Sequence, residues 1–187
     1  MTERPFDGGP AFPQPYSPRA FEKAMVFIDG TNLFNRLLRA KLRMPALLPI
    51  VSAACNGRQL LRASLYTTEE KLRVAVAYHG TQLVEGCRVV FGHSVATGSG
   101  DVREKGVDAL LVADLVYHAA QRNCQYAALF THDQDFLFAL RRVEDFGCKT
   151  SLVALCEDAA ESLKAACDDY WFLPADWLVS KGWATAA

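Results

Sequence analysis

Short apolar runs alternate with segments of helical periodicity along most of the chain. Residues 24–28 (AMVFI) form a continuous apolar run, which is typical of a strand buried on both faces. Further strands are predicted at residues 60–66, 88–91, 127–130, 151–155 and 170–173. Helices are predicted between them, at residues 31–43, 46–55, 68–84, 106–121, 133–146 and 157–167. The polar, glycine-containing residues 92–105 are expected to form a loop.

This alternation predicts an α/β fold with three layers, in which a mainly parallel sheet carries helices on both faces. The ligand crevice of such a sheet lies outside the carboxyl ends of its strands. Functional side chains are therefore expected directly after residues 28, 91, 130 and 155.

The two ends of the chain differ in composition from the part between them. Five of the eight prolines lie within the first 20 residues, so residues 1–22 are predicted to be a flexible tail. The α/β domain is predicted over residues 23–176, followed by a C-terminal extension at 177–187. Aromatic side chains near that end either pack on the core or dock a protein partner or a second copy of the chain: Trp171, Phe172, Trp177 and Trp183.

Neither a membrane span nor a cysteine framework is visible. No apolar run approaches the ~18 residues that a transmembrane helix needs. Residues 1–20 contain no apolar block that could serve as a signal-peptide core, so a cytoplasmic location is expected. The six cysteines are widely spaced with no Cys-x-x-Cys pair, which predicts buried free thiols rather than zinc ligands or disulfides.

Acidic residues follow two of the predicted strands. Asp29 comes directly after the run at 24–28, and Asp133 and Asp135 come shortly after the strand at 127–130. One Asp at such a position is explained by capping of the next helix. Two acids in residues 133–135 exceed that need, so we expect these carboxylates to open onto one crevice.

Two more acids lie on the predicted helix at residues 106–121. Asp108 shares a helical face with Leu111 and Leu115 and is therefore expected to point inward, toward the edge of the sheet. Asp114 lies about 120° around the helix. It is a secondary candidate that could equally bond a neighbouring basic group.

Carboxylates that converge at one edge repel one another and stay ionised together only when a cation neutralises them. Oxygen ligands without cysteine favour a hard ion, and the four acids therefore predict one or two Mg²⁺ or Mn²⁺ ions. An ion held in this way is suited to activating water and to stabilising a phosphoryl transition state.

Three segments resemble the NYN domain family, a branch of the PIN-like metal-dependent ribonucleases: VFIDGTNLF (26–34), KGVDALLVADL (105–115) and FTHDQDFLFALRRVEDFGCKTSLVAL (130–155). The resemblance implies a Rossmann-like sheet and an acidic metal site that cuts RNA. It also implies site residues. Asp29, Asp108, Asp133 and Asp135 match the acidic site, Asn32 matches a residue that orients Asp29 or touches substrate, and Thr131 matches a small hydroxyl before the third acid.

The chain departs from the family pattern at His132, where a small residue is usual. This imidazole could narrow the site, contact phosphate, or lie exposed at the end of the strand. Residues 66–87 carry no motif that matches.

The distribution of charge bears on an RNA partner. The net charge of −1 excludes a basic nucleic-acid coat. Residues 30–68, however, contain six Arg and Lys and no acid. Arg36 and Arg39 lie on the helix after Asp29, and Lys105 lies before Asp108, so these three side chains are predicted to hold the RNA backbone.

Two other functions are alternatives to a metal-dependent ribonuclease. Residues 28–31 (IDGT) are similar to part of the haloacid-dehalogenase-type phosphatase motif, but Phe27 stands where those enzymes carry the nucleophilic Asp. A non-catalytic RNA- or protein-binding regulatory module that keeps the acidic pocket stays open as an alternative.

Overall fold

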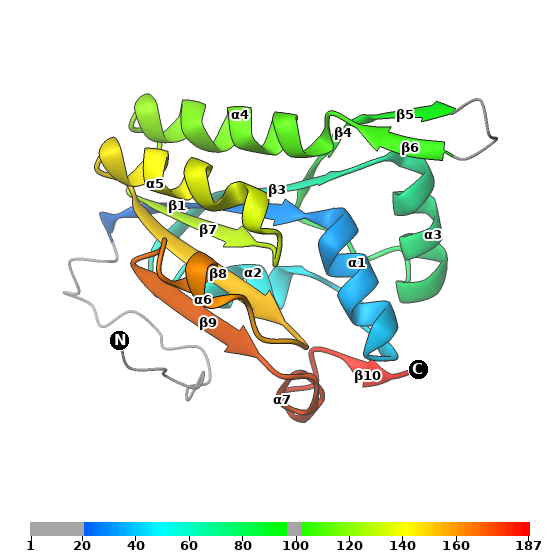
Figure 1. Cartoon of the computed structure of the whole chain (residues 1–187). Helices are drawn as coiled ribbons and strands as arrows, with labels where there is room; N and C mark the ends of the chain where they lie inside the picture. Colours follow the sequence, from blue (N-terminus) through cyan, green and yellow to red (C-terminus); the bar gives the residue numbers. More distant parts are fainter. Residues whose placement is uncertain (1–20, 97–101) are drawn as a thin grey trace.

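A six-stranded parallel sheet forms the centre of the molecule in the computed structural model, which describes residues 21–96 and 102–187 (Figure 1). The strands lie in the order β4-β3-β1-β7-β8-β9. Their bounds are β1 Lys23–Asp29, β3 Gln59–Thr67, β4 Arg88–Phe91, β7 Tyr126–Phe130, β8 Lys149–Leu155 and β9 Asp169–Leu173. The predicted α/β fold is confirmed.

Helices cover both faces of this sheet. They are α1 Gly30–Arg39, α2 Leu48–Ala54, α3 Glu69–His79, α4 Val107–Ala120, α5 Leu137–Asp145, α6 Glu161–Lys164 and α7 Ala175–Ser180. Alternate side chains of β1 point to opposite faces. Val26 and Ile28 pack with α1 and α2, whereas Met25 and Phe27 pack with α4 and α5. Two separate hydrophobic cores therefore hold the three layers together. None of the helices in the two described ranges is both long and apolar enough to cross a membrane.

The order of the strands shows where the ligand crevice of the sheet lies. The chain builds β1, β3 and β4 toward one edge, then returns to the other side of β1 and adds β7, β8 and β9. Ile28 at the end of β1 pairs with Phe130 at the end of β7. Such a reversal is where ligands bind in open α/β sheets. The residues that follow Ile28 and Phe130 therefore meet at one place.

The segment between β4 and α4 forms strands where a loop was predicted. Residues 92–105 were expected to form a loop, but β5 His93–Ala96 and β6 Val102–Lys105 form an antiparallel ribbon. Each strand is only four residues long and lies outside the main sheet. Neither HSVA nor VREK alternates between polar and apolar residues, so the sequence carries no strand pattern there.

Several predicted helices are shorter than expected. The helix predicted at 31–43 ends at Arg39, and Leu42–Arg43 instead form β2, which pairs with β10 (Thr185–Ala186) at the far end of the chain. The helix predicted at 157–167 is reduced to the four residues of α6. There the Asp158 carboxylate accepts a hydrogen bond from its neighbouring backbone N–H, at Ala159, which competes with helix formation.

The C-terminal aromatic residues pack on the chain's own core. Trp177 and Trp183 meet edge to face with their ring centroids 5.2 Å apart. Both rings, together with Trp171, are partly buried against the core on the α1 face. The structure thus shows these three side chains packed on the core, and docking of a partner through this segment stays a prediction.

We expect Gly30→Ala to destabilise the fold by about 1–3 kcal/mol, the usual cost of overpacking. A Cβ atom at Gly30 would lie 2.8 Å from the backbone oxygen of Tyr66, so α1 would have to move away from β3. Urea denaturation of the variant measures this cost. Ser52→Ala on the exposed side of α2 serves as control and should change stability by less than about 0.5 kcal/mol. An equally stable Gly30→Ala variant would contradict the close packing described here.

Candidate functional site

Asp29 is a buried acid at the junction of β1 and α1, with only 4% of its surface exposed. It ends the strand and caps the helix, because its Oδ1 accepts a hydrogen bond from the Asn32 N–H at 3.0 Å. Its Oδ2 accepts a second hydrogen bond from the Thr131 hydroxyl, also at 3.0 Å. The carboxylate is therefore fixed by groups from two neighbouring strand ends.

Thr131 ties the end of β7 to Asp29. Its hydroxyl donates to Asp29 and accepts from the Asp133 N–H at 3.1 Å. The Asp133 Oδ1 in turn accepts from the Asp135 N–H at 3.0 Å and begins a short 3₁₀ helix, Gln134–Phe136. A hydroxyl has one proton to give, and Thr131 gives it to Asp29. We therefore interpret Thr131 as a positioning residue rather than as a contact to substrate.

The pKa of Asp29 is raised above its ordinary value. Burial and, to a smaller extent, the like charges of Asp108 and Asp133 raise the pKa of its carboxyl to about 6. The hydrogen bonds from Asn32 and Thr131 act in the opposite direction but do not offset the burial. Three of the four predicted acids are thus close enough to influence one another electrostatically.

Asp108 reaches this group from a different position than predicted. The buried face of α4 is made by Val107, Leu111, Leu115 and Ala119, and Asp108 is exposed. The expectation that Asp108 continues the apolar face was wrong. The buried stripe begins one residue earlier, and one residue rotates a helix face by about 100°. The Asp108 carboxylate nevertheless lies where its charge acts on Asp29.

The remaining acids have different surroundings. Asp135 is exposed on the turn after Asp133. Asp114 lies further along α4 and accepts a hydrogen bond from the buried Tyr66 hydroxyl at 2.9 Å. Burial and Asp114 together raise the pKa of Tyr66. The structure thus uses Asp114 to satisfy a buried tyrosine.

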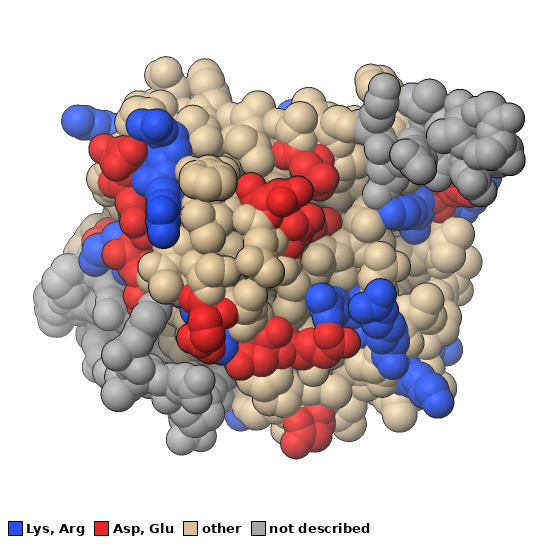
Figure 2. Space-filling model, in the orientation of Figure 1, with Lys and Arg blue, Asp and Glu red and all other residues tan. Residues whose placement is uncertain are grey.

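Figure 2 shows acidic side chains gathered near the middle of one face, with Lys and Arg side chains over α1 below them. Within residues 21–96 and 102–187, no group of three or more His, Cys, Asp or Glu side chains is close enough to form a ready-made metal cluster. This spacing still fits Mg²⁺, which usually keeps several water ligands and binds only one or two carboxylates directly. The donor set consists of carboxylate oxygens, as that ion prefers.

His132 lies between α1 and the loop after β8 and is half-buried. Its Nδ1 lies 3.0 Å from the Asn32 Oδ1, and its Nε2 lies 2.8 Å from the backbone oxygen of Glu157. Burial and the charge of Arg36 lower the pKa of His132 to about 4. The ring is therefore neutral at pH 7 and has a single N–H, which Nε2 donates to the Glu157 oxygen. Nδ1 is then an acceptor, and it holds Asn32 when that amide is flipped to present its NH₂ group to the ring. Sequence reasoning did not foresee this arrangement because Glu157 is distant in the chain.

Two of the three predicted phosphate-binding residues, Arg36 and Arg39, lie one turn apart on α1. Arg36 is in an ion pair with Glu157, whereas Arg39 is exposed on the same helix. Lys105 is the last residue of β6, and its side chain lies outside the described part of the structure.

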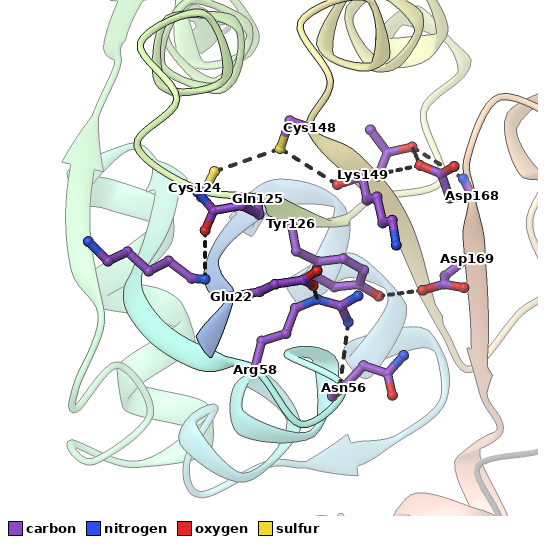
Figure 3. Close-up of polar contacts among 12 residues, drawn as sticks. Glu22, Asn56, Arg58, Cys124, Gln125, Tyr126, Cys148, Lys149, Asp168 and Asp169 are labelled. Atoms are coloured by element: carbon purple, nitrogen blue, oxygen red, sulfur yellow. Dashed lines mark hydrogen bonds and ion pairs between the residues drawn. The ribbon is translucent and has the colours of Figure 1, made fainter. Parts of the chain in front are cut away.

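Arg58, part of the acid-free stretch at 30–68, lies at the amino end of the sheet (Figure 3). Its Nε donates to Glu22 at 2.6 Å, and its guanidinium lies 3.9 Å from the centroid of the Tyr126 ring. The Tyr126 hydroxyl donates to Asp169 at 3.0 Å. Arg58 is thus a buried structural residue, and the basic surface beside the site is smaller than the charge count suggested.

All six cysteines are free thiols, and four of them are buried: Cys55, Cys124, Cys148 and Cys167. Cys124 and Cys148 lie before neighbouring strands with their sulfur atoms 3.9 Å apart (Figure 3). These thiols are at the amino end of the sheet and take no part in the acidic site.

Comparisons with known proteins agree with this architecture. The family model of the NYN domain matches residues 23–174. A crystal structure from Vibrio parahaemolyticus, described as a protein of unknown function, is similar with a TM-score of 0.66 and 14% identity. The match covers 86% of this chain and 98% of that one. At this identity the likeness shows the fold alone. No curated protein matches the chain closely enough to count as a relative.

We expect metal-free Asp29→Asn protein to be more stable than the wild type at pH 7.5. The pKa of Asp29 rises from 3.8 to about 6 on folding, so the folded state holds this proton more tightly. Stability is therefore lost as pH rises from about 4 through 6, by up to about 3 kcal/mol at 1.36 kcal/mol per pKa unit. Asn carries no such charge and avoids the loss.

The measurement is urea denaturation in EDTA at several pH values between 4 and 7.5. The difference in unfolding free energy between the two proteins should grow with pH and level off above 6.5. Asp176→Asn, at an exposed acid on α7, is the matched control and should follow the wild type. A difference that does not change with pH would show that Asp29 is ordinarily acidic.

Proposed function

Because the chain belongs to the NYN domain family, a nuclease-like branch of the PIN-like proteins, we propose that it is a Mg²⁺- or Mn²⁺-dependent ribonuclease that hydrolyses RNA phosphodiester bonds. The observation that supports this most directly is Asp29. A carboxylate lies at the reversal point of the sheet, where its burial and two other acids together raise its pKa to about 6. Such an arrangement costs stability and is characteristic of functional sites.

Asp29, Asp108 and Asp133 would hold the ion, and its charge would relieve their mutual repulsion. When bound, a divalent ion lowers the pKa of water and stabilises the charge that develops on a phosphate. Asn32 N–H and the Thr131 hydroxyl keep both Asp29 oxygens in a fixed orientation. The neutral His132 holds the Asn32 side chain at the mouth of the site.

Asp135 has a different role in this proposal. It lies two residues beyond Asp133, in the short 3₁₀ helix, and its side chain is exposed to solvent. It would accept a proton from the attacking water as the new P–O bond forms and the bond to the leaving ribose oxygen breaks. The exposed Arg39 would contact the phosphate backbone near α1.

We expect Asp29→Asn and Asp133→Asn each to reduce Mn²⁺-dependent cleavage of single-stranded RNA by at least about 100-fold, because each removes a charge that would hold the ion. Cleavage of a labelled RNA by purified protein, followed on denaturing gels, measures the loss. Asp176→Asn should cleave like the wild type. Undiminished cleavage by the Asp29→Asn protein would exclude this site as the active centre.

Mn²⁺ binding separates the ribonuclease from a non-catalytic module. The absence of a ready-made cluster among the described acids is the observation that favours the module. We expect calorimetry to show Mn²⁺ uptake by the wild type and much weaker uptake by Asp29→Asn. A wild type that takes up no Mn²⁺ and cuts no RNA would leave the binding module as the better function.

A further inference from the structure

A groove of about 280 Å³ runs between α1 and α3 and starts beside the acidic site. Thr31, which lines it, is two residues after Asp29 and begins α1 next to the carboxyl end of β1. Lys71 of α3 lines the same end, with its Nζ 3.3 Å from the Thr31 hydroxyl oxygen. One end of the groove therefore lies beside the carboxyl end of β1, the end of the strand that carries Asp29.

The groove changes character along its length. Its walls away from the site are apolar, with Leu38 on α1 and Val74 on α3. These side chains are 58% and 63% exposed, although both are large and apolar. Aromatic rings lie deeper, because Phe34 and His79 are buried and Tyr78 is half-buried. Polar groups at one end and apolar and aromatic groups at the other suit a flat ring that has a polar edge.

Tyr78 is held in place by its surroundings. Its ring meets the His79 ring edge to face, with centroids 4.8 Å apart. The Arg43 guanidinium lies 5.9 Å from the centroid of the Tyr78 ring, and its Nε donates to the Tyr78 backbone oxygen at 2.8 Å. A fixed aromatic ring beside an arginine is the usual platform on which proteins stack the bases of single strands.

The charges around the groove also favour an RNA strand. Lys71 lies at the end nearest the acids, Arg43 lies by Tyr78, and Arg39 is exposed on α1. A strand along α1 would meet cations at both ends of the groove. Glu70, exposed at the rim, is an acceptor for the amino group of a base.

The size of the groove limits its occupant. Pockets for drug-sized ligands measure roughly 300–1,000 Å³, so this groove is suited to one base and not to an amphipathic helix. We propose that the groove between α1 and α3 binds a nucleobase of the single-stranded RNA whose phosphodiester lies at the acidic site. This inference rests on the proposed ribonuclease function and adds a base-binding subsite to it.

The test measures RNA binding in EDTA, so that the result does not depend on cleavage. A fluorescent oligoadenylate and an oligomer of equal length made of abasic riboses are compared by anisotropy. We expect Tyr78→Ala to raise the Kd for oligoadenylate about tenfold, because base–aromatic stacking is lost. Tyr78→Phe keeps the ring and should bind like the wild type. The abasic oligomer should bind the wild type and Tyr78→Ala equally.

Two further variants serve as a control outside the groove and as a second test of the groove. Tyr117→Ala removes an exposed tyrosine from α4 and should leave both Kd values unchanged. Leu38→Ala changes an exposed groove wall, so it keeps the core intact, and should raise the Kd for oligoadenylate alone. This variant decides the question if Tyr78→Ala proves unfolded by circular dichroism.

The outcomes separate the subsite from the activity. If the wild type cleaves RNA but Tyr78→Ala and Leu38→Ala bind oligoadenylate normally, the subsite is overturned and the ribonuclease stands. If both variants lose base-dependent binding but the wild type cleaves nothing, the base-binding subsite is supported and the proposed ribonuclease activity is overturned. Equal binding of the abasic and adenylate oligomers to the wild type would overturn the subsite and point to a different occupant.

Discussion

The hydrogen bond from the Thr131 hydroxyl to Asp29 joins the two strand ends on which the site depends. β1 and β7 are neighbours only because the chain reverses direction across the sheet there, and the two residues are 102 positions apart. The same hydroxyl accepts the Asp133 N–H. One buried side chain thus links Asp29 to Asp133 and fixes their relative position.

The buried, ionised Asp29 lowers the stability of the fold. Burial of Asp29 near two like charges favours its protonated form, as its raised pKa shows. The surrounding sheet offsets this cost, because β1 is buried on both faces and packs into both hydrophobic cores. At this one carboxylate the proposed function conflicts with the stability of the fold, as is usual for functional sites.

The errors in the sequence-based predictions have different physical causes. β2 exists only because Leu42–Arg43 meet the far end of the chain, so local spacing predicted a longer helix there. Asp108 was placed on the wrong face because the periodicity of α4 leaves the start of its buried stripe uncertain by one residue. Arg58 counted as part of a basic surface, although the fold stacks it on Tyr126 at the opposite end of the sheet.

The sequence by itself determined the alternation of strands and helices, and with it the rule that Asp29 and Asp133 follow strands whose ends meet at one edge. These features depend on short-range patterns of apolar residues. Only the tertiary structure decided which groups surround those acids: the Thr131 bridge, the neutral His132 against Glu157, and the groove between α1 and α3. Each of these depends on contacts between segments far apart in the chain, and no local pattern encodes such contacts.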